Sequence, residues 1–134
     1  PPPAASQAAP DPAAIRAIVD EAVRPVLAQH DLPGGNPRQI RLHKGRYYIA
    51  HLADNWPKDR KSRGFISVLD ENFRVLSNIA GTPPAYDGSG RLQQMRHQEE
   101  VFLHPHDLIV DDEDSIYVAQ FASGNTYPIK LERV

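Results

Sequence analysis

The chain contains no cysteine, so disulfide bonds and thiolate metal sites are excluded. It also lacks a run of about 18 apolar residues, which excludes a membrane-spanning helix, and no intact targeting peptide is recognised in it. Its charges nearly balance, with a net charge of -2, so no field over the whole molecule that attracts nucleic acid is expected. Bulk charge is therefore not what recruits a partner.

Proline, by contrast, is abundant, with 13 residues in a chain of 134, and several of them crowd into the Ala/Pro-rich segment 1–10. Such a composition cannot bury much apolar surface, so residues 1–10 are expected to form a tether. The printed sequence begins with proline, and we expect a trimmed start of the kind that follows a removed signal or anchor. These features favour an extracytoplasmic location, periplasmic or secreted.

Residues 11–31 carry the signature of one amphipathic helix. Asp11 offers a side-chain acceptor at the N-cap, and Pro12 suits the first helical position, where a missing N–H has no cost. Pro25 is expected to kink or end the helix, and the breaker-rich stretch 32–37 marks the boundary to the next region. The apolar residues fall on one stripe that needs a cover, namely Ile15, Ile18, Val19, Ala22, Val23 and Val26.

The pattern from residue 38 to 134 is that of short antiparallel strands, rich in β-branched and aromatic residues and separated by turn formers. In the first unit, residues 38–80, the expected strands are Ile40–His43, Tyr47–Leu52, Phe65–Leu69 and Phe73–Ile79. In the second unit, residues 97–134, they are Leu108–Val110, Ile116–Phe121 and Ile129–Val134. Residues 92–102 form a polar connector that could be a helical turn or another strand. A fourth strand is missing from the second unit, so another segment or chain is expected to pair with its third strand.

A family resemblance is carried by the entrance Pro105-His106-Asp107-Leu108, the acidic turn 111–114, the strand Ile116-Tyr117-Val118 and the pair Lys130-Leu131. Residues 97–134 resemble the last blade of six-bladed β-propellers of the NHL-repeat type, and are most similar to the peptidyl-hydroxyglycine alpha-amidating lyases. Residues 38–80 look like the preceding blade. The resemblance implies a mainly β fold of two antiparallel propeller-type blades, a partial β-propeller, preceded by one amphipathic α-helix.

The same resemblance implies site residues. In those lyases the histidine of each Pro-His motif is one of three zinc ligands, and the aspartate after the last motif is catalytic. The resemblance therefore makes His106 a zinc ligand and Asp107 a catalytic residue, while the other two ligand-bearing blades have no counterpart in this sequence.

Two blades cannot close a propeller, because closure needs at least about four. A threefold assembly of two-blade chains would bring three copies of His106 round one axis and rebuild a zinc site with an open position. Alternatively, the chain is a fragment or a reduced subunit that lies against a larger partner. Both arrangements predict other protein chains as partners, in a homo-oligomer or a larger complex.

His104 and His106 are two residues apart, so both side chains share one face of an extended segment, a spacing compatible with metal binding. The plainer alternative is that His106 hydrogen-bonds within the fold and His104 is solvated. Asp107 could serve as a base or orient an imidazole, or it could simply cap a strand entrance. The run Asp111–Asp114 lacks the glycine and the ligand alternation of a calcium loop, so a solvated hairpin turn is expected there.

The long loop between the second and third strands combines one indole with four basic side chains: Trp56, Lys58, Arg60, Lys61 and Arg63. Such a cluster could grip phosphate, an acidic lipid headgroup or an acidic protein surface, with the indole stacked on what lies between. A solvated loop is the plainer alternative. This loop is the candidate contact site for a macromolecular partner.

These observations predict a binding or scaffold subunit that associates with other chains through its helix, its open strand edges and the Trp56 loop. Whether the chain is an enzyme stays open. The alternative is a zinc-dependent lyase with His106 as a ligand and Asp107 as the acid–base residue. A third possibility is a sugar-binding propeller built from oligomerised units, in which Trp56 stacks on sugar faces.

Overall fold

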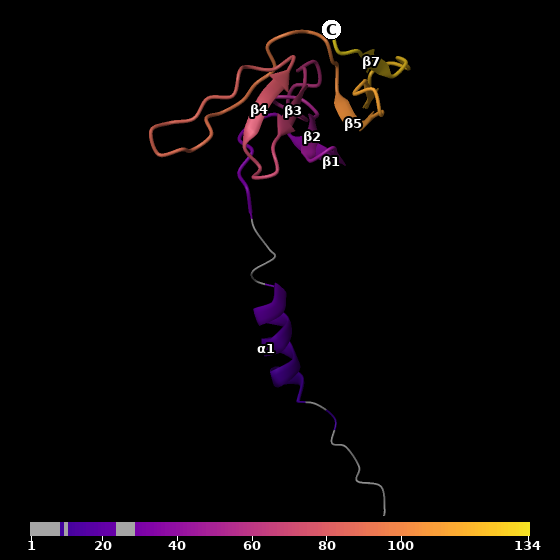
Figure 1. The fold of residues 1–134 in the computed structure, drawn as a ribbon. Helices are drawn as coiled ribbons and strands as arrows, with labels where there is room; N and C mark the ends of the chain where they lie inside the picture. The colour runs from indigo at the N-terminus through magenta and orange to yellow at the C-terminus, as the bar shows by residue number, and fades with distance from the viewer. Residues whose placement is uncertain (1–8, 10, 24–28) are drawn as a thin grey trace, which may run out of the picture. The chain divides into compact units, whose positions relative to one another are not determined.

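The computed structural model describes residue 9 and residues 11–23 and 29–134. The chain divides into two compact units, Pro1–His30 and Asp31–Val134, which are described separately (Figure 1). No helix among the described residues has the length and apolar character needed to cross a membrane. The predicted tether, residues 1–10, lies outside the described residues except for Ala9.

Among its described residues, the first unit contains one helix, α1, which runs from Pro12 to Val23. Asp11 is its N-cap as predicted, because its Oδ1 accepts a hydrogen bond from the backbone N–H of Ala13 at 3.1 Å. Residues 24–28, with the predicted kink at Pro25, lie outside the described residues. Residues 29–31 are not helical, so the expected extension of the helix to residue 31 is wrong.

Four strands of the second unit form an antiparallel sheet in the order β1-β2-β3-β4, with the bounds Pro37–His43, Arg46–His51, Phe65–Leu69 and Val75–Ile79. The β1–β2 hairpin turns on Lys44 and Gly45, with φ values of 45° and 75°. Positive φ at both central residues gives the turn the twist that antiparallel strands need, and glycine adopts it at no steric cost.

A second antiparallel sheet has the order β5-β6-β7, with the bounds Pro105–Val110, Ile116–Gln120 and Ile129–Leu131. The turn between β5 and β6 is held by Asp111, whose Oδ1 accepts from the backbone N–H groups of Glu113 at 3.0 Å and Ser115 at 2.8 Å. The acidic run is therefore a hairpin turn, as predicted. A carboxylate that bonds the backbone two residues on is a standard means of fixing such a turn.

The two sheets share one hydrophobic core. Apolar side chains that alternate along the strands face the other sheet, and seven of these residues are buried in the core, namely Tyr48, Ala50, Ile66, Val68, Leu108, Ile116 and Val118. Ala80 and Phe102, outside the strands, complete it. The period of two in the strands is the physical reason, since it places every second residue on the same face. Ile79, Val110, Ile129 and Leu131 pack against this core from its margins.

The other face of the four-stranded sheet is also covered. Buried Phe65 and Met95 belong to a second cluster, against which Leu32 and Leu92 pack. The covering segment between β4 and β5 holds no regular helix or strand and is tied down by isolated bridges such as Gly81 with His97. The connector 92–102 is thus neither of the two predicted alternatives. In Figure 1 part of the chain between β4 and β5 extends away from the sheet as a long loop.

The structure confirms a mainly β fold with two antiparallel sheets and one short helix. Several predicted strands were too long. β4 begins at Val75 rather than at Phe73, because the φ of 61° at Phe73 breaks the extended backbone. Likewise, β7 ends at Leu131 rather than at Val134. Within the described residues the seven strands close neither a barrel nor a propeller.

Candidate functional site

A groove of about 640 Å³ opens between the two sheets. Its floor is apolar and comes from both sheets, with Tyr48, Val68 and Ile79 on one side and Ile116 and Leu131 on the other. Its rim is polar and is formed by His43, Lys44, Arg46, Ser77, Asp114, Glu132 and Arg133. An apolar floor with a few charged groups at its margin is the usual character of a binding site.

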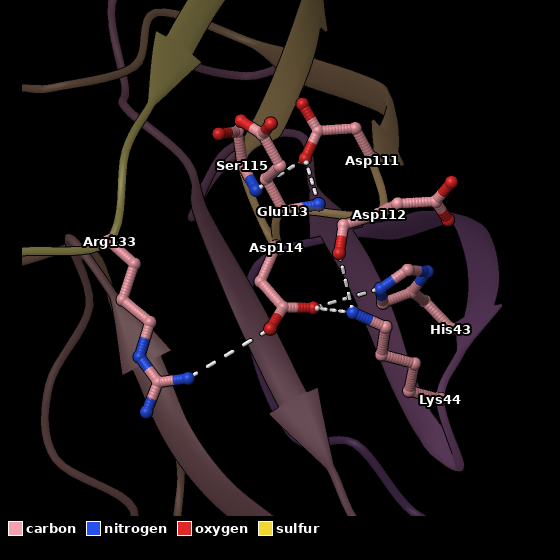
Figure 2. Close-up of polar contacts among 8 residues, drawn as sticks. All are labelled: His43, Lys44, Asp111, Asp112, Glu113, Asp114, Ser115 and Arg133. Carbon is pink, nitrogen blue, oxygen red and sulfur yellow. Dashed lines mark hydrogen bonds and ion pairs between the residues drawn. The ribbon is translucent and has the colours of Figure 1, made fainter.

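Asp114 organises this rim (Figure 2). Its Oδ1 accepts hydrogen bonds from Nε2 of His43 at 3.0 Å and from Nζ of Lys44 at 2.9 Å. Its Oδ2 lies 3.9 Å from a guanidinium nitrogen of Arg133. Lys44 and then His43 lower the pKa of the Asp114 carboxyl, because both favour its charged form. One carboxylate on the turn of the second sheet is therefore shared by three basic groups.

The turns of the two sheets are also joined through the backbone. Nζ of Lys44 donates to the carbonyl oxygen of Asp112 at 2.7 Å, in addition to its bond to Asp114 (Figure 2). Lys44 can reach this far because it occupies the β1–β2 hairpin turn, beside the β5–β6 turn. The rim is thus a fixed arrangement of charges at one end of the groove.

The rim carries an excess of positive charge. Asp114 is shared by its three basic neighbours, and Glu132 is paired with Lys130 at 2.5 Å. The side chain of Arg46 makes no hydrogen bond or ion pair with any residue that the structure describes, so its charge is available to a ligand. A groove with this lining suits a ligand that has an apolar body and an anionic group.

The sequence did not single out this groove, although it contained a usable signal. The two units repeat a strand, a turn and a strand, which puts the turns Lys44–Gly45 and 111–115 at corresponding positions. Corresponding turns of two packed sheets lie at the same end. The lysine on one turn and the acidic run on the other were therefore candidates for a pair, on the condition that the two sheets pack together.

The predicted metal ligands have different surroundings. His104 is buried, and its Nδ1 donates to the carbonyl oxygen of Phe121 at 2.9 Å. Its Nε2 is buried without a hydrogen-bond partner among the described residues, and the ring of Trp56 lies edge-on, 4.9 Å between centroids. His106 is half-buried beside the ring of Phe121, 5.6 Å between centroids. The pairing of β5 with β6 is irregular between Pro105 and Asp107, so the spacing of two no longer guarantees that both imidazoles share a face.

Asp107, the predicted catalytic residue, is engaged by Arg41 of β1. Both its oxygens accept from the guanidinium, the Nε contact measuring 2.9 Å. Its Oδ1 also accepts from the backbone N–H of Leu108 at 2.8 Å. Hydrogen bonding by Arg41 lowers the pKa of the Asp107 carboxyl, which makes it a weaker base. In this arrangement Asp107 joins the two sheets.

The predicted partner-binding loop is ordered by its own hydrogen bonds. Trp56 is half-buried against His104, and its carbonyl oxygen accepts from Nδ2 of Asn36 at 3.0 Å. The Arg60 guanidinium lies 5.6 Å from the centroid of the indole ring, a cation–π contact. Of the other basic residues, Arg63 lies 3.6 Å from a carboxylate oxygen of Glu100. Lys58 and Lys61 are exposed and form no ion pair with a described residue.

A buried polar network was also missed. The imidazole of His51 is fully buried, and its Nε2 lies 2.9 Å from Oγ of Ser67. Oγ of Ser67 also lies 2.7 Å from Oδ1 of Asn78, and Nδ1 of His51 lies 3.3 Å from the carbonyl oxygen of Gly34. Burial lowers the pKa of His51 to about 4. Because Ser67 is fully buried as well, this hydroxyl–imidazole pair is a structural element of the core, not a nucleophile open to a substrate.

A second imidazole–carboxylate pair joins Asp54 and His97. Nδ1 of His97 donates to Oδ2 of Asp54 at 2.5 Å, and the backbone N–H of His97 donates to the same carboxylate at 3.0 Å. These bonds fasten the segment between β4 and β5 to the loop after β2. The pair is a tertiary anchor that the sequence alone did not indicate.

Zinc, implied by the resemblance, is tested against these donors. A catalytic zinc site takes three protein ligands, and within the described part of the chain no three His, Asp, Glu or Cys side chains gather closely enough to hold a metal ion. Nδ1 of His104 is already used by a backbone carbonyl, and Asp107 is held by Arg41. The donor set of one chain therefore does not fit such a zinc ion. The role of His106 as a ligand stays a prediction.

Comparisons with protein-family models, with curated proteins and with solved structures found no match to this chain.

Proposed function

We propose that this chain is a binding module, an extracytoplasmic pair of NHL-type, propeller-like sheets that acts as a scaffold subunit and associates with other protein chains. The observation that carries the proposal is the groove between the sheets, with its apolar floor and its cationic rim. Partners of matching chemistry present apolar side chains beside carboxylates. The exposed residues Lys58 and Lys61 of the Trp56 loop offer a further cationic surface.

The chemistry of the site supports binding rather than turnover. Several groups that could transfer protons are committed to structural contacts: Asp107 to Arg41, Asp114 to its three basic neighbours, and His51 to the buried core. A general base has to be free to meet a substrate proton. The groove, in contrast, offers an uncommitted guanidinium, that of Arg46, above an apolar surface.

Titration with an anilinonaphthalene sulfonate dye tests the groove, because this probe joins an apolar ring system to an anionic group. We expect saturable fluorescence enhancement that the charge reversal Arg46→Glu weakens. The matched control is Lys58→Glu, which reverses an exposed charge on a loop that does not line the groove. Equal binding by both variants would contradict the assignment of the groove.

The lyase alternative is tested with the same preparation. We expect the purified chain to bind no stoichiometric zinc and to leave a peptidyl-α-hydroxyglycine substrate unchanged. Stoichiometric zinc together with turnover, both lost in His106→Ala, would overturn the binding module in favour of the enzyme.

A further inference from the structure

We propose that β7 pairs edge to edge with β7 of a second copy of this chain, antiparallel and in a register centred on Leu131. The pairing would join the two three-stranded sheets into one sheet of six. This inference rests on the proposed function, since it names the second copy as one of the protein partners of the module.

The free edge of β7 is the first observation. β7 is the last strand in the order β5-β6-β7, so alternate backbone groups of Ile129–Leu131 point away from β6. The corresponding edge of the other sheet is blocked, because the hydroxyl of Tyr86 bonds both the N–H of Val75, at 2.7 Å, and its carbonyl oxygen, at 3.4 Å. No such cover lies over β7 among the described residues. In Figure 1, β7 lies at the margin of the β unit.

The charges along this edge are self-complementary. Nζ of Lys130 lies 2.5 Å from a carboxylate oxygen of Glu132, the residue that follows β7, so the two side chains lie on the same side of the chain. In an antiparallel pair centred on Leu131, each Lys130 stands opposite Glu132 of the second copy, and this happens twice. Opposite charges on directly facing residues stabilise a strand pair.

The same charges exclude the neighbouring registers. A pair centred on Lys130 sets the two lysines against each other, and a pair centred on Glu132 sets the two glutamates against each other. Like charges that face directly are destabilising. A register whose centre lies midway between two neighbouring residues, such as Lys130 and Leu131, puts the charged face of one copy on the same side of the sheet as the apolar face of the other. The register centred on Leu131 is therefore the one that the sequence of the strand favours.

The apolar side chain at the centre, Leu131, agrees with this register, while Ile129 stands opposite Arg133 of the second copy. Ile129 and Leu131 pack against the shared core, and Leu131 lines the groove. Pairing sets Leu131 beside Leu131 of the second copy on that face, which removes apolar surface from water. The two-fold axis runs perpendicular to the joined sheet, so both grooves stay on one face. Pairing of residues 129–133 extends β7 by two residues and is short compared with a standard interface, so we expect a dimer that dissociates on dilution.

The test is a charge exchange, followed by light scattering and sedimentation of the full chain over a concentration series. The wild-type chain is expected to pass from monomer to dimer as concentration rises. Lys130→Glu alone and Glu132→Lys alone should each weaken self-association by roughly tenfold. The double variant, Lys130→Glu with Glu132→Lys, should restore self-association. Mixing the two single variants yields a heterodimer, because the two glutamates of the first variant then face the two lysines of the second.

The mixture is the decisive arm, since the pair within one chain is broken in both single variants and only pairing between chains can rescue it. Circular dichroism of every variant controls for folding. A wild-type chain that stays monomeric, or a dimer indifferent to the single reversals, overturns the proposal. Dye binding in the groove would survive either result, so failure of the strand pairing and failure of the proposed function are distinguishable.

Discussion

Arg41 of β1 donates through Nε to the Asp107 carboxylate of β5 at 2.9 Å and ties the two sheets together. The two residues are 66 positions apart in the chain, and both side chains are partly exposed, 47% and 30% respectively. Two guanidinium donors on one carboxylate fix the relative orientation of the two side chains as well as the distance between them. The pair therefore sets how β5 lies against β1, next to the rim of the groove.

The first prediction concerns this pair. Asp107→Asn and Arg41→Gln should each lower the melting temperature slightly, and the double variant should lower it by less than the sum, as coupled residues do. Since Asp107 has a lowered pKa, its contribution is present above about pH 3.8, the ordinary value, and is lost as the pH falls through the folded pKa. Thermal unfolding of the wild type, both single variants and the double variant at two salt concentrations provides the check. Strict additivity would show that the pair does not join the sheets.

The second prediction follows from the buried imidazole of His51. Its pKa is about 4 in the folded chain and 6.5 in its ordinary state, so the unfolded chain takes up a proton first as the pH falls. Stability is therefore full above about pH 6.5 and declines by roughly 3 kcal/mol toward pH 4. Urea unfolding across this range measures the decline. An NMR titration that places the His51 midpoint near 6.5 would refute the prediction.

The third prediction concerns the partner of that imidazole. Oγ of Ser67 bridges Nε2 of His51 and Oδ1 of Asn78, so Ser67→Ala leaves a buried imidazole nitrogen without its hydrogen-bond partner. The expected loss is about 1–3 kcal/mol in the free energy of unfolding. Ser77→Ala is the matched control, because this exposed serine lies on the neighbouring strand β4. Equal effects of the two substitutions would argue against the network.

The fourth prediction compares two glycines. A Cβ on Gly64 would lie 2.0 Å from the carbonyl oxygen of His51 and 2.5 Å from that of Leu52, and backbone cannot yield as a flexible side chain can. Gly64→Ala should cost at least about 3 kcal/mol of stability. Gly88→Ala is the control, since nothing lies within 4 Å of a Cβ there. Chemical denaturation measures the free energy of unfolding of both variants. A Gly64→Ala protein as stable as the wild type would contradict the close approach of the two carbonyl oxygens to residue 64.

The fifth prediction tests whether Trp56 of the basic loop packs within the fold or serves only as an exposed contact for a partner. Trp56 contacts His104 and Phe121 with centroid distances of 4.9 and 6.0 Å, so Trp56→Ala should lower stability by about 2 kcal/mol. Lys61→Ala, an exposed neighbour on the same loop, should change it little. Melting temperatures of the two variants are compared. An unchanged Trp56→Ala would mean that the indole serves only as an outward contact.

Some of the candidate site could be read from the chain and some could not. The acidic turn was predictable because Asp111 bonds backbone groups only two and four residues away. The spacing of His104 and His106 was less informative, because an irregularity in the pairing of β5 with β6 means that alternation alone does not say which face each imidazole takes. The half-buried position of Trp56 could not be read from the local sequence either, because it depends on His104 and Phe121, about 50 and 65 positions away.

The sequence by itself determined the helix start at Asp11, the strands and their turns, because these follow from interactions over a few residues. Only the tertiary structure decided which side chains meet across the sheets. Asp114 and His43 are 71 positions apart, and nothing in their local sequence pairs them. Their meeting depends on how two apolar faces pack into one core, and burial of apolar surface is not directional. The groove and its charged rim are consequences of that packing.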